Sequence, residues 1–309
     1  MMKKSVTIME VCPRDGWQNL ATSIPLETKL KYVRGMLDTG VKIIQIGSFV
    51  SPRAVPQMAT TGDLARAIVN EYPDVEFNAL VPNLKGAQLA HDAGIRSICY
   101  VMSATEGHNQ ANIGKTREKS LEDLKVLTET MTDMNICLSL STAFGCPFEG
   151  ETPAENVLTL VEKGAELGIK WFELGDTIGS AAPGQVINLF GKLKTRYPEF
   201  TFMAHMHDTR NNGILNSWLA AMNGADIVHT ALGGLGGCPF APGASGNTAT
   251  EDFVYLLEKS GIETGVDLQK VIALAKSMRE EIDGVYSGHQ INIRDDVYER
   301  ACQTKALQN

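Results

Sequence analysis

Two histidines separated by one residue, His205 and His207, are the side chains of this sequence best placed to bind a metal ion. They come at the end of a short apolar run, residues 202–206, which is typical of a buried strand. Residues two apart on a strand point to the same side, so both imidazoles would face one point. Metal binding explains such a pair better than two separate core histidines do.

Two further segments carry chemistry, and each also follows an apolar run. Arg14 and Asp15 follow the run 6–11, although a turn with a surface ion pair would equally account for this dipeptide alone. The second segment has six glycines between residues 233 and 246 and contains Cys238. Taken alone, Cys238 would be interpreted as an inert buried thiol.

Asp15, His205, His207 and Asn247 together offer two nitrogen and two oxygen ligands. Mixed nitrogen and oxygen ligands without a thiolate favour octahedral Mg2+ or Mn2+, with zinc as the weaker alternative. A cation with open positions beside Arg14 can hold oxyanions and stabilise an enolate. The sequence therefore predicts a metal-assisted site for carbonyl or carboxylate chemistry.

The elements that must position these residues are eight short apolar runs that alternate with helical patterns. Strands buried on both faces of a parallel sheet are typically of this kind. The runs are residues 6–11, 43–47, 77–81, 97–102, 136–141, 171–174, 202–206 and 227–231.

Strand–helix alternation repeated eight times predicts an α/β fold, a (β/α)8 TIM barrel. The candidate residues would then gather at the carboxyl ends of the strands, where barrels of this kind build their active sites. An open doubly wound sheet is the alternative, but it requires fewer strands and a glycine motif at its switch point. Residues 248–282 add helical patterns, so we expect one barrel domain over 1–282 and a tail of unknown role over 283–309.

Charge and composition exclude several classes of protein. The 309 residues carry 28 Lys and Arg against 36 Asp and Glu, a net charge of -8. Such a chain lacks the basic surface of a nucleic-acid binder or of a protein that docks on anionic membranes. A local cation and one arginine can still bind an anionic small molecule.

The six cysteines include no Cys-x-x-Cys pair, so we expect reduced thiols and a cytoplasmic protein. No signal-peptide core and no membrane-spanning run is apparent. Among the other histidines, His91 and His108 are expected at the surface or satisfied by neighbours, and His229 is expected to be structural.

Five segments carry a resemblance to a known family. They are residues 10–19, 48–52, 174–179, 205–209 and the run Gly-Leu-Gly-Gly-Cys-Pro-Phe-Ala-Pro-Gly-Ala-Ser-Gly-Asn at 234–247. In this order they resemble the 3-hydroxy-3-methylglutaryl-CoA lyases, which belong to the metal-dependent barrel lyases with an Arg-Asp-Gly motif. The match extends from about residue 6 to about residue 282.

The resemblance implies a role for each matching residue. The implied metal ligands are Asp15, His205, His207 and Asn247; the implied catalytic residues are Arg14, Cys238 and His205; the implied substrate-binding residues are Gln45, Ser48, Asp176 and Thr177. The reaction would be a retro-Claisen cleavage of an acyl-CoA substrate with bound Mg2+ or Mn2+. Arg14 would stabilise the thioester enolate, and Cys238 would help to deliver a proton to it. A homodimer is expected.

The sequence also departs from the family pattern. Gln45 stands where the family usually has Glu, so an acceptor is kept and a negative charge is lost. Trp17, Leu20 and Arg210 are further departures, and Arg210 could be either a second carboxylate clamp or a solvated loop residue. Three functions follow: a hydroxymethylglutaryl-CoA lyase, a related lyase for a different 3-hydroxy-dicarboxylyl-CoA, or a metal-binding paralogue without activity.

Overall fold

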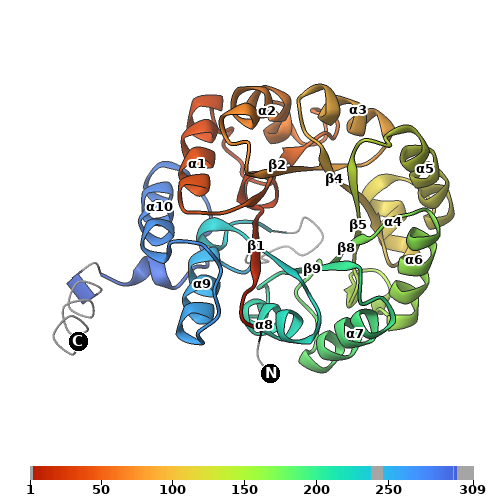
Figure 1. Cartoon of the computed structure of the whole chain (residues 1–309). Helices are drawn as coiled ribbons and strands as arrows, with labels where there is room; N and C mark the ends of the chain where they lie inside the picture. The colour runs from red at the N-terminus through yellow and green to blue at the C-terminus, as the bar shows by residue number, and fades with distance from the viewer. Residues whose placement is uncertain (1–2, 238–245, 295, 298–309) are drawn as a thin grey trace.

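Eight parallel strands close into a barrel in the computed structural model, which describes residues 3–237, 246–294 and 296–297 (Figure 1). Each strand of the barrel pairs with the barrel strands before and after it in the chain, and β1 closes the ring against β10. The strands are β1 Thr7–Glu10, β2 Ile43–Ser48, β3 Glu76–Val81, β4 Ser97–Ser103, β5 Asn135–Ser141, β8 Trp171–Asp176, β9 Thr201–Met206 and β10 Ile227–Thr230. The predicted (β/α)8 barrel is confirmed.

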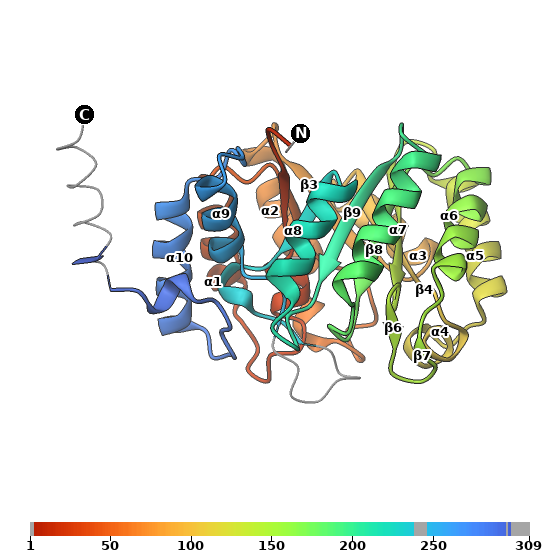
Figure 2. The ribbon, with the colours of Figure 1, turned by 90° about the horizontal axis from the view of Figure 1, so that it is seen from below.

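Helices surround the barrel and cover the outer face of its sheet (Figures 1 and 2). They are α1 Leu26–Asp38, α2 Thr61–Ile68, α3 Leu84–Asp92, α4 Glu106–Ile113, α5 Arg117–Thr130, α6 Ala154–Glu166, α7 Pro183–Arg196, α8 Gly213–Asn223, α9 Thr250–Lys259 and α10 Leu268–Glu281. The helical patterns predicted over residues 248–282 are α9 and α10, and α10 packs against α1 and α9. No helix in the described ranges is long and apolar enough to cross a membrane.

Two insertions lie at one end of the barrel, beside the carboxyl ends of the strands (Figure 2). One is α4, between β4 and α5; the other is a small antiparallel hairpin of β6 Gly145–Cys146 and β7 Gly150–Glu151. At the opposite end, Gly40 ends the first helix with φ +102°, and a Cβ there would collide with the carbonyl oxygen of Gly265. Glycine is therefore required at this helix end.

The carboxylate of Glu10, at the end of β1, hydrogen-bonds to the segments that follow β1 and β10. It accepts hydrogen bonds from the backbone amides of Cys12 (2.8 Å) and Leu232 (3.0 Å) and from the hydroxyl of Thr250 (2.7 Å). Burial raises the pKa of Glu10 to about 7, and the three hydrogen bonds oppose the rise. Glu10 thus anchors the turn that carries Arg14 and Asp15.

We expect the stability of the wild-type protein to fall relative to Glu10→Gln as the pH rises. A carboxyl with a folded pKa of about 7 holds its proton in the folded state while the unfolded chain, with a pKa near 4.5, has released it. The free energy of unfolding then decreases, by on the order of 2 kcal/mol between about pH 5.5 and about pH 7.5. Urea unfolding of both proteins across this range measures the difference, and parallel pH profiles would contradict it.

Candidate active site

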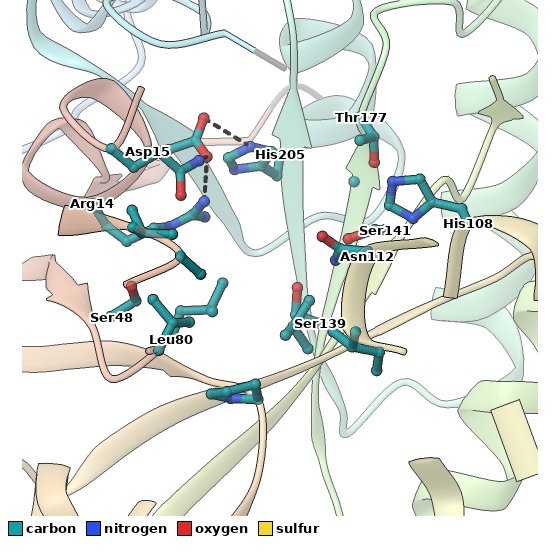
Figure 3. Close-up of a pocket in the computed structure, with 18 of the residues that line it drawn as sticks. Arg14, Asp15, Ser48, Leu80, His108, Asn112, Ser139, Ser141, Thr177 and His205 are labelled. Atoms are coloured by element: carbon teal, nitrogen blue, oxygen red, sulfur yellow. Dashed lines mark hydrogen bonds and ion pairs between the residues drawn. The ribbon is translucent and has the colours of Figure 1, made fainter. Parts of the chain in front are cut away.

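A cavity of about 450 Å³ opens where the carboxyl ends of the barrel strands meet. Arg14 and Ser48 lie on one side of it, and His108 and Thr177 lie on the other, with His205 between the two sides (Figure 3). This is the end of the barrel at which the sequence predicts the candidate residues.

A tight π-helical turn, η1 Cys12–Gly16, brings Arg14 and Asp15 into the cavity. The carbonyl of Val11 accepts hydrogen bonds from the amides of Arg14 (3.1 Å) and Asp15 (2.8 Å), which folds the chain back on itself. Both side chains are buried, and the guanidinium donates from its terminal nitrogen to Asp15 and from Nε to Gln45. The alternative of a surface ion pair is therefore wrong.

His205 and His207 face the same point at the end of β9, as their spacing predicts. Their Nε2 atoms lie 3.0 Å apart. Oδ2 of Asp15 is 3.8 Å from Nε2 of His205 and 3.5 Å from Nε2 of His207. These three donor groups form one buried cluster whose ligand atoms all lie within 4.8 Å of one another.

Asn247, the fourth predicted ligand, lies beside this cluster. Its Nδ2 donates to Oδ2 of Asp15 (2.8 Å) and to the carbonyl of Leu235 (3.0 Å), and its backbone forms a bridge with His207. Gly236 has φ +134°, and a Cβ there would collide with the Asn247 amide, so a glycine is needed for this close approach.

The electrostatics of the cluster fit a divalent cation. Burial by itself raises the pKa of the Asp15 carboxyl, but the positive charge of Arg14 is the largest of the opposing effects, and together they hold the pKa below its ordinary value. Burial is also the largest cause that lowers the pKa of His205 and of His207, which favours the neutral rings and the lone pairs they offer. Neutral imidazoles beside an ionised carboxylate are a donor set that divalent cations accept.

The second nitrogen of each ring lies outside the cluster. Nδ1 of His205 lies 3.1 Å from Nδ1 of His229, which leaves Nε2 for the cluster. Nδ1 of His207 is buried and has no hydrogen-bond partner in the part of the chain that the structure describes. The residues present therefore fit a bound metal, although which ion they hold stays a prediction.

The four predicted substrate-binding residues occupy different positions. Ser48 and Thr177 line the cavity, and Thr177 also accepts a hydrogen bond from the amide of Thr142 (2.7 Å). Gln45 is fully buried beneath Arg14. Asp176 is not among the described residues that line the cavity.

The carboxylate of Asp176 turns instead to the backbone of the following loop. It accepts hydrogen bonds from the amides of Ser180 (2.8 Å) and Ala181 (3.1 Å). Burial raises the pKa of Asp176 to about 6, against the effect of these two amides and of Arg210.

Arg210 donates to the carbonyl of Ile178 (2.6 Å) and is not among the described residues that line the cavity, which is the arrangement of a loop residue. Cys238 lies outside the described residues.

Two polar residues near the cluster were not predicted as part of the site. Glu173 lines the cavity, and its Oε1 lies 3.9 Å from Nδ1 of His205. The only sequence signal for it is a carboxylate inside the apolar run 171–174. His229 was expected to be structural; it contacts His205 from the neighbouring strand, in direct register with it. Spacing along one strand cannot reveal a partner on another.

Comparison with known proteins gives the family. The HMGL-like family model matches residues 5–278. The chain belongs to the HMGL-like family. The members of this family are divalent-metal-dependent, and its named relatives are carbon–carbon lyases, so this chain is a carbon–carbon lyase.

Individual relatives in the HMGL-like family cover most of the chain. It is 42% identical to the hydroxymethylglutaryl-CoA lyase YngG of Bacillus subtilis, over 90% of this chain and 94% of that protein. It is 39% identical to the (R)-citramalyl-CoA lyase of Chloroflexus aurantiacus, over 87% and 89%.

Solved structures agree with this assignment to the HMGL-like family. The HMG-CoA lyase of Bacillus subtilis superposes with a TM-score of 0.90 at 39% identity, covering 96% of this chain and 99% of that one. An HMG-CoA lyase from Acinetobacter baumannii in complex with coenzyme A and 3-methylmalate has a TM-score of 0.88 at 35% identity, covering 94% and 97%.

Proposed function

We propose that this lyase cleaves 3-hydroxy-3-methylglutaryl-CoA to acetyl-CoA and acetoacetate. The observation that carries the proposal is the buried cluster of Asp15, His205 and His207 with Arg14 beside it, on the wall of one cavity. A cleavage of this kind needs a bound hydroxyl, a base and a stabilised enolate, and the cluster offers a group for each. The relative at 42% identity carries the name of this activity.

We assign the cation to Asp15, His205, His207 and Asn247, and expect Mg2+ or Mn2+. When bound, the cation would supply Lewis acidity that lowers the pKa of the substrate hydroxyl. The role of Asp15 is to bring a permanent negative charge, because its pKa stays below the ordinary value despite burial. The neutral rings of the histidines add donors without adding charge.

The base that takes the hydroxyl proton is His205 in this proposal. Its Nε2 faces Asp15, and its Nδ1 is 3.1 Å from His229, so the protonated ring would be held on both sides. Asp15, His207 and Asn247 would hold the cation on their own whenever Nε2 of His205 carries the proton, because a protonated nitrogen has no lone pair to offer.

Arg14 stabilises the thioester enolate that remains when the carbon–carbon bond breaks. Its guanidinium lines the cavity and is fixed at Nε and at one terminal nitrogen, which leaves further N–H donors for the substrate. A positioned donor acts strongly in a buried site, because no solvent needs to reorganise when the charge develops. Ser48 and Thr177, on the cavity wall, are assigned to binding the substrate.

Cys238 is assigned to the return of a proton to the enolate carbon. Replacing Cys238 by alanine is expected to lower kcat by about 10²-fold, the lower end of what a positioned proton donor contributes. Bound Mn2+, measured by electron paramagnetic resonance, should stay at the wild-type stoichiometry. Cys146→Ala serves as the control, since Cys146 is a thiol that is not among the described residues lining the cavity. Wild-type turnover in Cys238→Ala would remove this residue from the mechanism.

A second candidate is the cleavage of citramalyl-CoA, which would give acetyl-CoA and pyruvate. It is favoured by Gln45, which replaces the usual carboxylate next to Arg14, and by a citramalyl-CoA lyase at 39% identity. Both reactions release acetyl-CoA from a branched 3-hydroxydicarboxylyl thioester, so the same machinery serves either.

One assay tests the proposal and separates the two candidates. The protein is supplied with Mg2+ or Mn2+ and a panel of branched 3-hydroxydicarboxylyl-CoA thioesters, and acetyl-CoA, acetoacetate and pyruvate are measured. Acetoacetate with the highest kcat/KM supports the first candidate, and pyruvate with the highest kcat/KM supports the second. Release of acetyl-CoA from none of the thioesters would overturn both.

A cytoplasmic homodimer with one barrel domain over residues 1–282 and a tail of unknown role over 283–309 remains our proposal for the whole molecule. Light scattering coupled to size-exclusion chromatography measures the predicted dimer directly. Residues 287–290 of this tail hydrogen-bond to Gly233, Gly234 and Asp252, so the boundary is tested by truncation after residue 282 alongside truncation after residue 294. Wild-type turnover numbers in both variants would support the boundary at 282, and a loss in the shorter variant alone would overturn it.

A further inference from the structure

Three buried polar side chains form a line across the inside of the barrel beneath Arg14. Gln45, Asn78 and Ser97 lie on the adjacent strands β2, β3 and β4, and each pairs in direct register with the next. They are 0%, 2% and 4% exposed, so solvent does not supply their hydrogen bonds. Leu80 and Val101, which lie on the same sides of β3 and β4 as Asn78 and Ser97, line the cavity. Gln45, Asn78 and Ser97 therefore lie beneath the floor of the cavity, one layer deeper in the barrel.

Arg14 determines which group donates and which accepts in each hydrogen bond along this line. Arginine is a donor at every nitrogen, so Nε of Arg14 requires the amide oxygen of Gln45. The amide nitrogen of Gln45 must then face away, and it donates to Oδ1 of Asn78 (2.9 Å). The amide nitrogen of Asn78 in turn donates to Oγ of Ser97 (3.0 Å).

We infer that Asn78, itself held by Ser97, is a positioning residue that accepts from the Gln45 amide nitrogen and so holds the amide oxygen toward Arg14. A glutamine side chain is nearly symmetric in shape, and only its hydrogen-bond partners decide which end faces Arg14. If the amide turned over, its nitrogen would oppose Nε of Arg14, donor against donor, and the guanidinium would leave its place on the cavity wall. A carboxylate at position 45 would need no such control, because both of its oxygens accept.

The inference rests on the role proposed for Arg14 and predicts a dependence between two positions. Asn78→Leu keeps the approximate size and removes the acceptor for the Gln45 amide. It should lower kcat about tenfold, the value of one buried hydrogen bond, with a smaller change in KM. In a Gln45→Glu background the same substitution should change kcat by less than about twofold, since a carboxylate presents an acceptor to Arg14 whichever way it turns.

Ser97→Ala is the milder variant if Asn78→Leu folds poorly. It removes only the partner of the Asn78 amide, and we expect a smaller loss of kcat that the Gln45→Glu background again abolishes. Ser120→Ala is the matched control, because Ser120 is equally buried but lies on α5, outside the line. Equal losses in the wild-type and Gln45→Glu backgrounds, or no loss in the wild-type background, would overturn the inference.

A spectroscopic measurement keeps this test independent of the substrate. In protein labelled with 15N-arginine, the Nε–H of Arg14 should give a resonance that exchanges slowly with solvent. Its exchange should become faster in Asn78→Leu and Ser97→Ala, return to the slow regime when Gln45→Glu is added, and stay slow in Ser120→Ala. Unchanged exchange in both Asn78→Leu and Ser97→Ala would reject the positioning role, whereas a wild-type protein that turns over no thioester would reject the proposed function alone.

Discussion

Replacing Asp15 by asparagine is expected to lower the cation-dependent kcat/KM by at least ~10³-fold, because the several kcal/mol that a bound cation contributes would be lost. Asp15 is the carboxylate of the cluster it forms with His205 and His207. Asparagine keeps the size but brings no charge, and its amide nitrogen is a hydrogen-bond donor. That nitrogen would meet another donor, because Arg14 and Asn247 both donate to Asp15 in the wild-type protein.

Cation affinity separates this explanation from simple unfolding. The dissociation constant for Mn2+, followed by electron paramagnetic resonance, should rise by more than about 100-fold, since even residues that only support a ligand commonly cost 10–100-fold. Asp74→Asn is a matched control, because Asp74 is exposed and precedes β3, at the end of the barrel away from the cavity. If Asp15→Asn binds Mn2+ as tightly as the wild type, Asp15 is not a ligand.

The barrel could be predicted from the sequence because its strands are buried on both faces. Their apolar runs stand out from the polar loops, and all eight coincide with observed strands to within a few residues. The α4 insertion and the hairpin of β6 and β7 were not predicted. Both are short, and α4 carries a polar sequence, Glu-Gly-His-Asn-Gln-Ala-Asn-Ile, without a helical apolar stripe. Tertiary packing rather than periodicity determines such segments.

The cluster of Asp15, His205 and His207 could also be predicted, although its three residues are far apart in the chain. The spacing of the two histidines on one strand indicates that both point to the same side, and the barrel brings the end of the first strand to the same face. What sequence could not supply was the π-helical turn that buries Arg14 and Asp15, since the hydrogen bonds that fold it, from the amides of Arg14 and Asp15 to the carbonyl of Val11, join backbone atoms.

Contacts between neighbouring strands account for most of what was missed. Asn78, Ser97, Glu173 and His229 each meet a partner on another strand, and those pairings depend on the register of the barrel. A register is set by packing and loop geometry, which a pattern along one strand does not contain. For the same reason Gln45 was predicted as a substrate contact, whereas its described partners are Arg14 and Asn78.

Arg14→Lys is expected to lower kcat by about 10³-fold, at the upper end of what the loss of one positioned donor to a developing oxyanion costs. Lysine keeps the positive charge, so Asp15 remains ionised and Mn2+ should bind with less than about threefold change in affinity. What disappears is the planar fork, which donates at Nε to Gln45 while a terminal nitrogen donates to Asp15. An ammonium group on a flexible stem cannot hold both partners and still present a donor at a fixed point in the cavity.

Steady-state kinetics at saturating cation measure this effect, and a titration of Mn2+ on the same preparation reports the ligand cluster separately. Arg34→Lys is the control, since Arg34 lies on α1 and pairs with Glu71 at the surface. A kcat within about tenfold of the wild type would mean that a point charge is sufficient, because a tenfold change corresponds to only about 1.4 kcal/mol of barrier. In that case the orientation of the Arg14 guanidinium would not matter for turnover. The hydrogen bonds from Gln45 to Ser97 would then have no effect on kcat, and Asn78→Leu should turn over at the wild-type rate.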